Sequence, residues 1–502
     1  MASTFAGLAI AARGLYASQT GLLVTGNNIS NVNTAGYSRQ VVNQSAASPA
    51  AVYAGKGVIG GGVQVNAVDR VRNIRLDEKY WQENTDLGEW QTKADTLTEL
   101  EELLTSTTDG YSEIMNDFYE ALESLANNAG DTSVRTAVRS AGEELCGYLN
   151  NAAAELRQLQ QDCNTDVATT VTRINAYSQQ IADLNEQIRL AGASGADTNT
   201  LEDQRALLVD KLSSLVSITV DQSADNAAAF TIRTAGGVLV SGNTANLLET
   251  YQNTDGLYDV RWQDTGDAFT PAGGSLKAYL DLRDGTGIDG GYQGIPYYTA
   301  QLNEFARTLA AAFNEGIYAD GADYGNGHAD GYGTNGQTGI RFFSYDKTSS
   351  ADLQALLDGG ATMDEVYSNI TAANISLSSD IYDDVGHIAA ASAAGEEANN
   401  EIVNSLISML QDNKMFNKGT PEDFMNSLVA TLGTNSASAQ RMADNQGTIV
   451  KRVGDRRTSV SGVSTNEETA NLTIYEQAYE ASSQVVSVWN EVYAVTINLI
   501  SD

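Results

Sequence analysis

A cluster of possible metal ligands lies in the glycine-rich stretch 319–340. It contains four oxygen-bearing side chains: Asp320, Asp323, Asn326 and Asp330. A calcium loop of the EF-hand kind needs such side chains at alternate positions followed by glycine, and this spacing differs. The two histidines, His328 and His387, lie outside any HExxH motif, which would place two histidines on one helix face for zinc. We therefore predict turn residues here, and neither a metal site nor a cofactor.

Catalytic motifs are equally scarce in the sequence. It contains no GxSxG, no GxxxxGK[ST], and no GxGxxG on a strand-to-helix turn. Two carboxylates suffice for glycoside hydrolysis, but with 64 acidic residues no pair stands out. Cys146 and Cys163 fall within one expected helix, roughly 25 Å apart and too distant for a disulfide. We expect no catalytic residue and no enzymatic activity.

Charge and composition exclude further classes of function. The 502 residues include 29 Lys and Arg against 64 Asp and Glu, a formal net charge of −35. Nucleic acids and anionic membranes attract basic patches, so we expect neither as a partner. At about 150 residues per domain, the length predicts three or four domains. The sequence shows no membrane span and no secretory signal, which by itself predicts a cytoplasmic protein.

The two ends of the chain differ from its middle. Residues 1–68 contain no Asp or Glu, whereas residues 459–502 contain no Lys or Arg. Opposite charge predicts that the two ends meet in space. Both ends also repeat apolar residues every seven positions, which is typical of helices that pair side by side.

The N-terminal repeat consists of two series. One is Leu8, Leu15, Leu22 and Ile29, and the other, three residues earlier in each case, is Phe5, Ala12, Gln19 and Gly26. Three glycines, Gly7, Gly14 and Gly21, each weaken a helix by roughly 0.8–1 kcal/mol, so the predicted coil is weak. Asparagine and glycine dominate the stretch 27–37, which predicts turns and the end of the helix.

The C-terminal repeat is stronger. Its two series are Leu472, Tyr479, Val486, Tyr493 and Ile500, and Tyr475, Ser482, Trp489 and Thr496. A second apolar row of Val485, Val492 and Leu499 lies beside them and is widened by Val488 and Val495. A helix so apolar must be buried on several sides, so we infer that the ends are buried between copies of the protein. Thr465 and Glu468 predict a capping box before this helix.

The middle of the chain reads as a helical rod interrupted by β modules. Apolar residues recur at helical spacing from about 70 to 216, with helices expected around 87–104, a short one around 118–125, and a long one over 134–188. Between 217 and 284 the period becomes that of strands, with Gly236-Gly237 as a hairpin signal.

Helices return at 297–317, 396–411 and 421–455. The predicted fold class is therefore mainly α with inserted β. We divide the chain into a terminal coiled-coil domain (1–65 with 459–502), a helical-bundle rod domain (66–216, 285–318 and 386–458), a small antiparallel β-domain (217–284) and an irregular β- and turn-rich module (319–385).

Several stretches resemble the bacterial flagellar axial proteins, the family of rod, hook and hook-associated subunits. The N-terminal match covers 14–22 and 36–40 and centres on Asn27, Asn28, Ile29, Asn31, Val32, Asn33, Thr34, Gly36 and Tyr37. The C-terminal stretches 460–463, 467–472 and 475–479 resemble the branch that forms the first junction between hook and filament. Two internal stretches, 174–188 and 201–212, are similar to the same branch.

The resemblance implies a structural role in a flagellar tube. It implies that both termini pair as the innermost layer, and that the protein is secreted by the flagellar type III apparatus without a cleaved signal. This reverses the cytoplasmic expectation. Expected partners are further copies of itself, the hook protein, a second junction protein on the filament side, and an export chaperone on the C-terminal helix.

The residues expected at the assembly interface come from the seven-residue repeats: Phe5, Leu8, Leu15, Leu22, Ile29, Leu472, Tyr475, Tyr479, Val486, Trp489, Tyr493 and Ile500. Two alternatives stay open. One is a rod or hook subunit, against which the long helix at 134–188 argues. The other is a secreted enzyme or adhesin carried on a flagellar scaffold, with its activity in 217–385.

Overall fold

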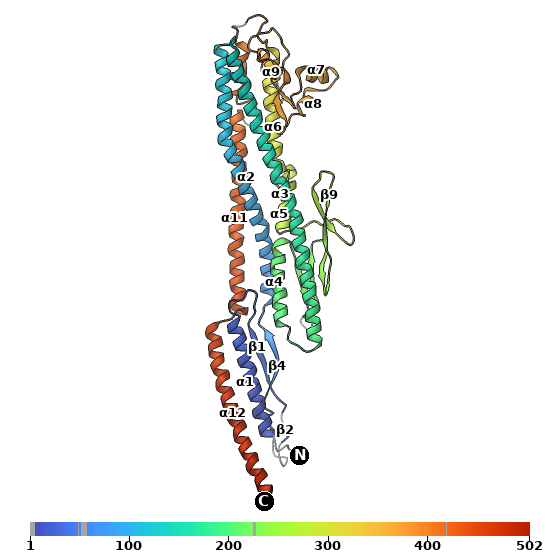
Figure 1. The fold of residues 1–502 in the computed structure, drawn as a ribbon, viewed down its shortest axis with the longest axis vertical. Helices are drawn as coiled ribbons and strands as arrows, with labels where there is room; N and C mark the ends of the chain where they lie inside the picture. Colours follow the sequence, from blue (N-terminus) through green and yellow to red (C-terminus); the bar gives the residue numbers. More distant parts are fainter. Residues whose placement is uncertain are drawn as a thin grey trace.

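The computed structural model describes residues 6–48, 50–51, 58–223, 227–396, 398–417 and 419–501. The molecule is elongated, with both termini at one end (Figure 1). A pair of terminal helices occupies that end, a bundle of long helices forms the rod, and small β and turn-rich modules lie along its side and at its far tip (Figure 1). This arrangement confirms the predicted class, mainly α with inserted β.

Three long helices form the rod: α2 (Ile74–Asn127), α3 (Thr132–Ala193) and α11 (Pro421–Ser461). Shorter helices pack beside them: α4 (Asn199–Leu215), α5 (Ser275–Asp284), α6 (Ile295–Glu315) and α10 (Glu401–Leu410). The expected long helix is confirmed in α3. The expectation of separate helices around 87–104 and 118–125 is wrong, because α2 runs without a break through both. Burial of Tyr111 and Phe118 in the rod core stabilises this helix despite Gly110.

Two apolar clusters form the core of the rod. The first joins α2, the first half of α3, α6, α10 and α11, and includes the packed rings of Phe118, Phe313 and Phe342. The second joins Trp81, the second half of α3, α4 and the neighbouring sheet. Among the described residues, neither cluster contains a member of the terminal helices. Cys146 and Cys163 are both buried in α3 and free, as predicted.

The side module is an antiparallel sheet packed against α3. It consists of β5 (Thr219–Gln222), β6 (Phe230–Thr234), β7 (Gly237–Ser241) and β8 (Thr244–Ala245), followed by the pair β9 (Leu248–Gln252) and β10 (Tyr258–Trp262). The predicted hairpin is confirmed: Thr234 pairs with Gly237, and Gly236 adopts φ +90°, which favours glycine. The prediction of β structure up to 284 is wrong, since α5 occupies 275–284 and packs on α2 and α3.

The tip of the rod is a turn-rich module. It contains β11 (Phe343–Tyr345) paired with β12 (Ile375–Leu377), helices α7 (Ser350–Asp358), α8 (Met363–Tyr367) and α9 (Ser379–Asp383), and the 3-10 turns η3 (His328–Asp330) and η4 (Val385–His387). A further 3-10 turn, η2 (Ile288–Gly290), lies between α5 and α6. Asp320, Asp323 and Asp330 accept hydrogen bonds from backbone N–H groups of their own turns. They are turn residues, as predicted.

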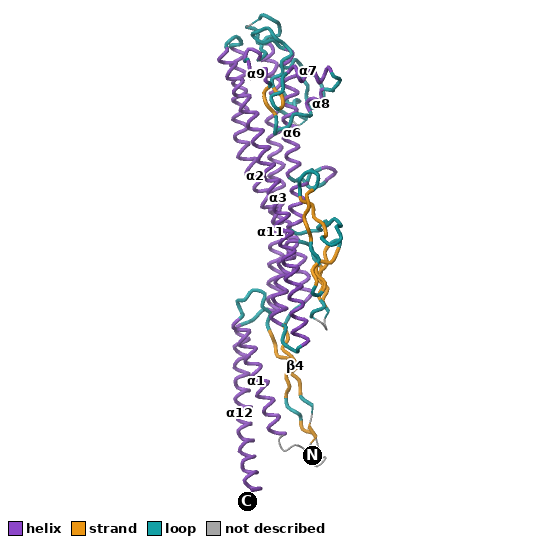
Figure 2. Tube along the Cα trace, turned by 45° about the vertical axis from the view of Figure 1, so that its right-hand side comes forward, coloured by secondary structure: helices purple, strands orange, loops and turns teal. Residues whose placement is uncertain are grey.

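The terminal region consists of α1 (Ala6–Ser30), α12 (Thr465–Ser501) and a β ribbon beside α1 (Figure 2). The ribbon pairs β1 (Gln40–Ala46) with β4 (Val63–Arg70), and β2 (Ala50–Ala51) with β3 (Val58–Ile59). It was not predicted from the sequence. Within the described part of the chain, no helix is long and apolar enough to cross a membrane.

Candidate assembly interface

The two terminal helices pair in antiparallel orientation, through small residues on α1 and larger ones on α12. A Cβ atom added to Gly7 would lie 2.1 Å from the Trp489 ring, and one added to Gly21 would lie 2.5 Å from the Tyr475 ring. Midway, Gly14 faces Ser482. A seven-residue step forward on α1 therefore matches a seven-residue step back on α12, and glycine permits the close approach.

The glycines belong to a continuous row on α1 with alternating steps of four and three. We call it the contact row: Gly7, Ala11, Gly14, Ser18, Gly21, Thr25 and Asn28. Five of these residues are buried: Ala11, Ser18, Gly21, Thr25 and Asn28. The matching contact row on α12 is Tyr475, Tyr479, Ser482, Val486, Trp489 and Tyr493. From the sequence, these glycines were expected only to weaken the helix. In the structure they allow the aromatic side chains of α12 to approach the backbone of α1 closely.

The predicted interface residues fall on or beside these rows. Leu8, Leu15, Leu22 and Ile29 are half-buried, one residue beyond the contact row of α1. On α12, Leu472, Tyr475, Val486, Trp489 and Tyr493 are half-buried, and Tyr479 is 36 % exposed at the edge. Phe5 lies outside the described residues, and Ile500 is described only as part of the helix backbone. Their role between copies stays a prediction.

A second apolar row on α12 faces solvent. We call it the valine row: Ile474, Ala478, Ala481, Val485, Val488, Val492 and Val495. Exposure of its larger members is high, with Ile474 at 61 %, Val485 at 46 %, Val488 at 57 %, Val492 at 45 % and Val495 at 59 %. Full burial of such a side chain is worth about 1.5–3 kcal/mol, so the row represents a large unused free energy of association.

Asn28 joins the helix pair to the ribbon. Its side chain is fully buried and makes four hydrogen bonds. The amide nitrogen donates to the Gln40 carbonyl at 2.8 Å and to a Glu468 carboxylate oxygen at 3.0 Å. The amide oxygen accepts from the Gln40 N–H at 3.0 Å and from the Tyr37 hydroxyl at 2.9 Å. Because all its hydrogen-bonding capacity is used, a substitution here would leave buried polar groups unpaired.

The surrounding motif residues end the helix and shape the turn. Asn31 donates to the Asn27 carbonyl, and Thr34 donates to the Asn31 side chain, as expected of a stretch rich in asparagine. Gly36 adopts φ +81° beside Leu207 of the rod. Val32, Asn33 and Thr34 are exposed. Burial, and then the nearby carboxylates of Asp203 and Glu468, raise the pKa of Tyr37 to about 12, so its hydroxyl remains a donor.

Glu468 has a different role from the one predicted. The capping-box prediction with Thr465 is wrong, because Thr465 is the first residue of α12 and the Ser464 hydroxyl accepts from the Glu467 N–H at 3.5 Å. Glu468 is only 2 % exposed and accepts from Arg39 Nε at 2.8 Å as well as from Asn28. A tertiary ion pair thus takes the carboxylate that a cap would have used.

Charged residues connect this turn to the rod. Asp203 of α4 accepts from the Ser38 backbone N–H at 2.9 Å and from the Ser38 hydroxyl at 2.7 Å. Arg70 of the ribbon pairs with Asp203 at 2.8 Å and with Glu202. Arg457 near the end of α11 pairs with Asp210. These pairs are largely buried, so removing one partner is expected to be much more damaging than at the surface.

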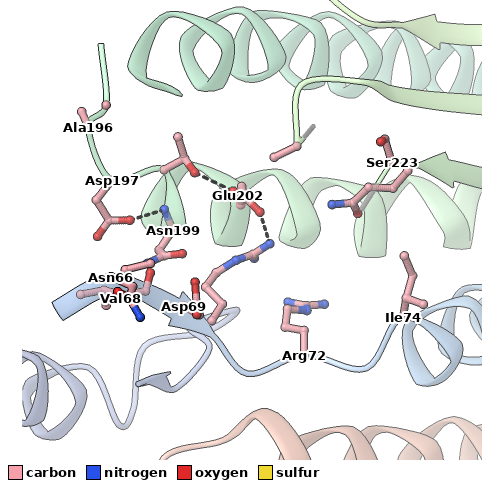
Figure 3. Close-up of a pocket in the computed structure, with 16 residues that line it drawn as sticks. Asn66, Val68, Asp69, Arg72, Ile74, Ala196, Asp197, Asn199, Glu202 and Ser223 are labelled. Atoms are coloured by element: carbon pink, nitrogen blue, oxygen red, sulfur yellow. Dashed lines mark hydrogen bonds and ion pairs between the residues drawn. The ribbon is translucent and has the colours of Figure 1, made fainter. Parts of the chain in front are cut away.

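The Arg70–Glu202 pair borders a cleft of about 790 Å³ between β4 and the turn that joins α3 to α4 (Figure 3). Glu202, which pairs with Arg70, lies on the same wall as Asp197, and Asp197 accepts from the Asn199 N–H (Figure 3). Among the described residues, no group of three or more His, Cys, Asp or Glu side chains is placed to hold a metal ion. The cleft marks the joint between terminal region and rod.

Sequence reasoning did not identify Asp203 and Glu202 as joint residues. They belong to the internal stretch 201–212, which was quoted only for its resemblance. Arg205 of that stretch donates to the Asn185 side chain at 2.7 Å, and Asn185 donates to the Gly242 carbonyl at 2.7 Å. The two internal motifs therefore meet each other, the ribbon and the sheet in one place.

Comparison with known proteins gives consistent matches. The model of the flagellar hook-associated protein FlgK helical domain matches residues 97–343. Flagellar hook-associated protein 1 of Bacillus subtilis is 30 % identical over 99 % of both chains, and that of Escherichia coli is 27 % identical over 97 % of this chain and 98 % of the relative. The solved flagellar hook junction protein FlgK from Burkholderia pseudomallei shares the fold, with a TM-score of 0.62 at 18 % identity, covering 76 % of this chain and 100 % of that chain.

Proposed function

The chain belongs to the flagellar hook-associated protein 1 family, and from this premise we propose that it builds the junction zone between hook and filament. It is a structural component of the bacterial flagellum. It acts by self-assembly through its terminal helices rather than by making or breaking bonds. The observation that carries this mechanism is the valine row, which the folded chain leaves in solvent, whereas the rod helices α2, α3 and α11 pack their apolar residues into the core clusters.

The rod and the terminal region have different roles in the proposed assembly. The rod holds its shape through two large cores of its own, so it can stay rigid whether or not the ends are engaged. Asp203 of α4 fixes the turn after α1 to the rod through Ser38, and Asn28 and Arg39 join that turn to Glu468 of α12. The apolar rows are thus held in a defined orientation before assembly, which reduces the entropic cost of association.

We further propose which neighbours the chain contacts. These are other copies of itself, the hook protein on one side and a second junction protein on the filament side. An export chaperone would cover α12 before secretion through the flagellar type III apparatus, since an exposed valine row invites aggregation in the cell. Nucleic acid and membranes are not proposed as partners, given the net charge of −35.

The alternatives have less support. A rod or hook subunit would not account for the match of hook-associated protein 1 over nearly the full length. An enzyme or adhesin in 217–385 lacks a specific observation in its favour, and the clustered acids Asp320, Asp323 and Asp330 accept hydrogen bonds within their own turns. We propose that the chain is not an enzyme.

The test is to delete the gene in its host, image the cell surface and assay the medium for free filament subunits. Intact hooks without filaments, with subunits lost to the medium, are the expected result. Loss of the hooks as well would move the protein to the rod or hook. Normal filaments would contradict the proposal and direct attention to 217–385.

A further inference from the structure

Each terminal helix carries two apolar rows, of which the pair uses one. On α1 the leucine row is Leu8, Ala12, Leu15, Gln19, Leu22, Gly26 and Ile29, one residue after the contact row. On α12 the valine row lies one residue before the contact row. Both follow the same alternation of three- and four-residue steps as the rows already in contact. A helix that meets its neighbours along two such rows has room for two partner helices.

The leucine row and the valine row lie on opposite faces of the helix pair. One residue corresponds to a rotation of about 100° around a helix. In an antiparallel pair, rows that follow the contact row on both helices share a face. A row that follows it on one helix and a row that precedes it on the other therefore point in opposite directions. One face of the pair thus offers leucines and the opposite face offers valines.

Charge selects which helix can cover the valine row. Between Thr465 and Ser501, α12 carries five glutamates and no basic residue: Glu467, Glu468, Glu476, Glu480 and Glu491. A second α12 on the valine row would bring two such sets together, which is unfavourable. By contrast, α1 carries no acid and one base, Arg13, so its approach meets no like charge.

We propose that the valine row of each copy is covered by the leucine row of a second copy, so that terminal pairs associate face to back. This rests on the proposed function, because it names the partner surface for the same assembly. The contact is heterologous: every copy uses one face to bind and offers the other to the next. Such contacts generate rings or helices rather than closed dimers, as a tubular zone requires.

The proposal also fixes polarity and register. Copies repeated around a tube point the same way, so the incoming α1 runs antiparallel to the α12 it covers. A contact between a given leucine and a given valine therefore recurs seven residues later on α1 and seven residues earlier on α12. The structure supplies both halves of this repeat, because the two rows extend over several turns.

Cysteine cross-linking on assembled flagella tests the pairing. Leu15→Cys is expressed in the same cells as one of Val485→Cys, Val488→Cys or Val492→Cys, always beside the wild-type chain so that flagella form. A disulfide needs Cα atoms within about 7 Å, so one of the three mixtures should give a cross-linked dimer. Shifting that pair by seven, with Leu22→Cys and the α12 residue seven positions earlier, should give the same yield.

The same helices provide negative controls for the cross-linking experiment. Each single variant alone should give no dimer, and Glu491→Cys, on the acidic face of α12, should give none with Leu15→Cys. The native thiols do not interfere, because Cys146 and Cys163 are buried inside α3 and burial raises their pKa.

The outcomes separate this proposal from the proposed function. Dimers from a valine-row variant alone would mean that valine rows pair with each other, and would overturn the face-to-back contact. No dimer in any mixture on normal flagella would overturn it as well, with another protein covering the row. Both results leave the junction role intact, which the gene deletion tests independently.

Discussion

The rod and the terminal pair are both built from long helices, yet they bury their apolar surface in different ways. In the rod, Leu145, Leu149 and Leu156 of α3 are inaccessible to solvent, because α2, α6 and β12 pack against that helix within the same chain. In the terminal pair, Val488 and Val495 stay more than half exposed. The comparison teaches that the rod is complete as a monomer, whereas the terminal pair is half of an interface.

The largest expected difference concerns assembly. Val486→Asp places a carboxylate on the contact row of α12 and should abolish filaments, because a charge buried without a partner is strongly unfavourable. Electron microscopy of cells carrying the variant measures this. The thermal unfolding temperature of the rod, measured on the purified full-length variant, should stay unchanged, since the described core clusters contain no residue of α12. Val486→Leu is the matched control, and normal filaments on the aspartate variant would contradict the comparison.

A second contrast compares the shortening of one apolar side chain in the rod with the shortening of one in the terminal pair. Leu149→Ala removes a fully buried side chain from the rod core and should lower the free energy of unfolding by about 2–5 kcal/mol. Val488→Ala removes an exposed one and should change it by less than about 0.5 kcal/mol in the monomer. Urea denaturation of the purified chains provides both values. Equal losses would mean that the valine row is covered in the monomer.

Acid should weaken the tip of the rod. His328 is buried, with Nδ1 bonded to the Ile340 carbonyl and Nε2 accepting from the Ala389 N–H, and burial lowers its pKa to about 4. The unfolded chain therefore binds a proton at higher pH than the folded one. The stabilisation is complete above about pH 6.5 and is lost as pH falls towards 4, by up to about 3 kcal/mol.

Comparing wild type with His328→Gln isolates this effect from the many carboxylates. Urea denaturation at pH 7, 5.5 and 4.5 should show a steeper loss of stability in the wild type than in the variant. Parallel curves would show that the histidine is not the titrating group. The terminal pair contains no histidine in its described residues and should show no matching step in helicity.

The smallest expected effect separates two glycines of α1. A methyl group at Gly26 meets no atom within 4 Å, so Gly26→Ala should stabilise the helix by up to about 1 kcal/mol. Gly7→Ala gains the same propensity but places the methyl 2.1 Å from the Trp489 ring, so the pair must move apart. Fluorescence of Trp489 during thermal unfolding, in a chain whose Trp81, Trp90 and Trp262 are replaced by phenylalanine, reports on this contact. A stabilising Gly7→Ala would contradict the close packing described for the contact row.

Much of this architecture could be predicted from hydrophobic periodicity and charge. The long helix α3, the pairing of the two ends and the hairpin at Gly236 each leave a local signal in the sequence. The contact row of α1 does not, because periodicity weights the leucines, whereas the packing depends on how little space the glycines fill. The ribbon was missed because many of its side chains face solvent, which leaves no clear alternation of buried and exposed positions.

The contacts at the joint between the terminal region and the rod could not be predicted from the sequence, for a different reason. Thr465 and Glu468 match a capping-box pattern in the local sequence. In the folded chain, however, the Glu468 carboxylate accepts hydrogen bonds from the tertiary partners Asn28 and Arg39 instead. Asp203 likewise finds its partners on segments far away in sequence. Local patterns describe what a side chain can do, and only the fold decides which of its options is used.

The glycines of the contact row also set a dimension. Helices usually lie about 8–10 Å apart, and a row of glycines allows the lower end of that range. If the terminal pairs line a tube, as the family resemblance implies, the spacing within each pair is the thickness of its inner wall. Alanine at the three glycines of α1 would then thicken that wall.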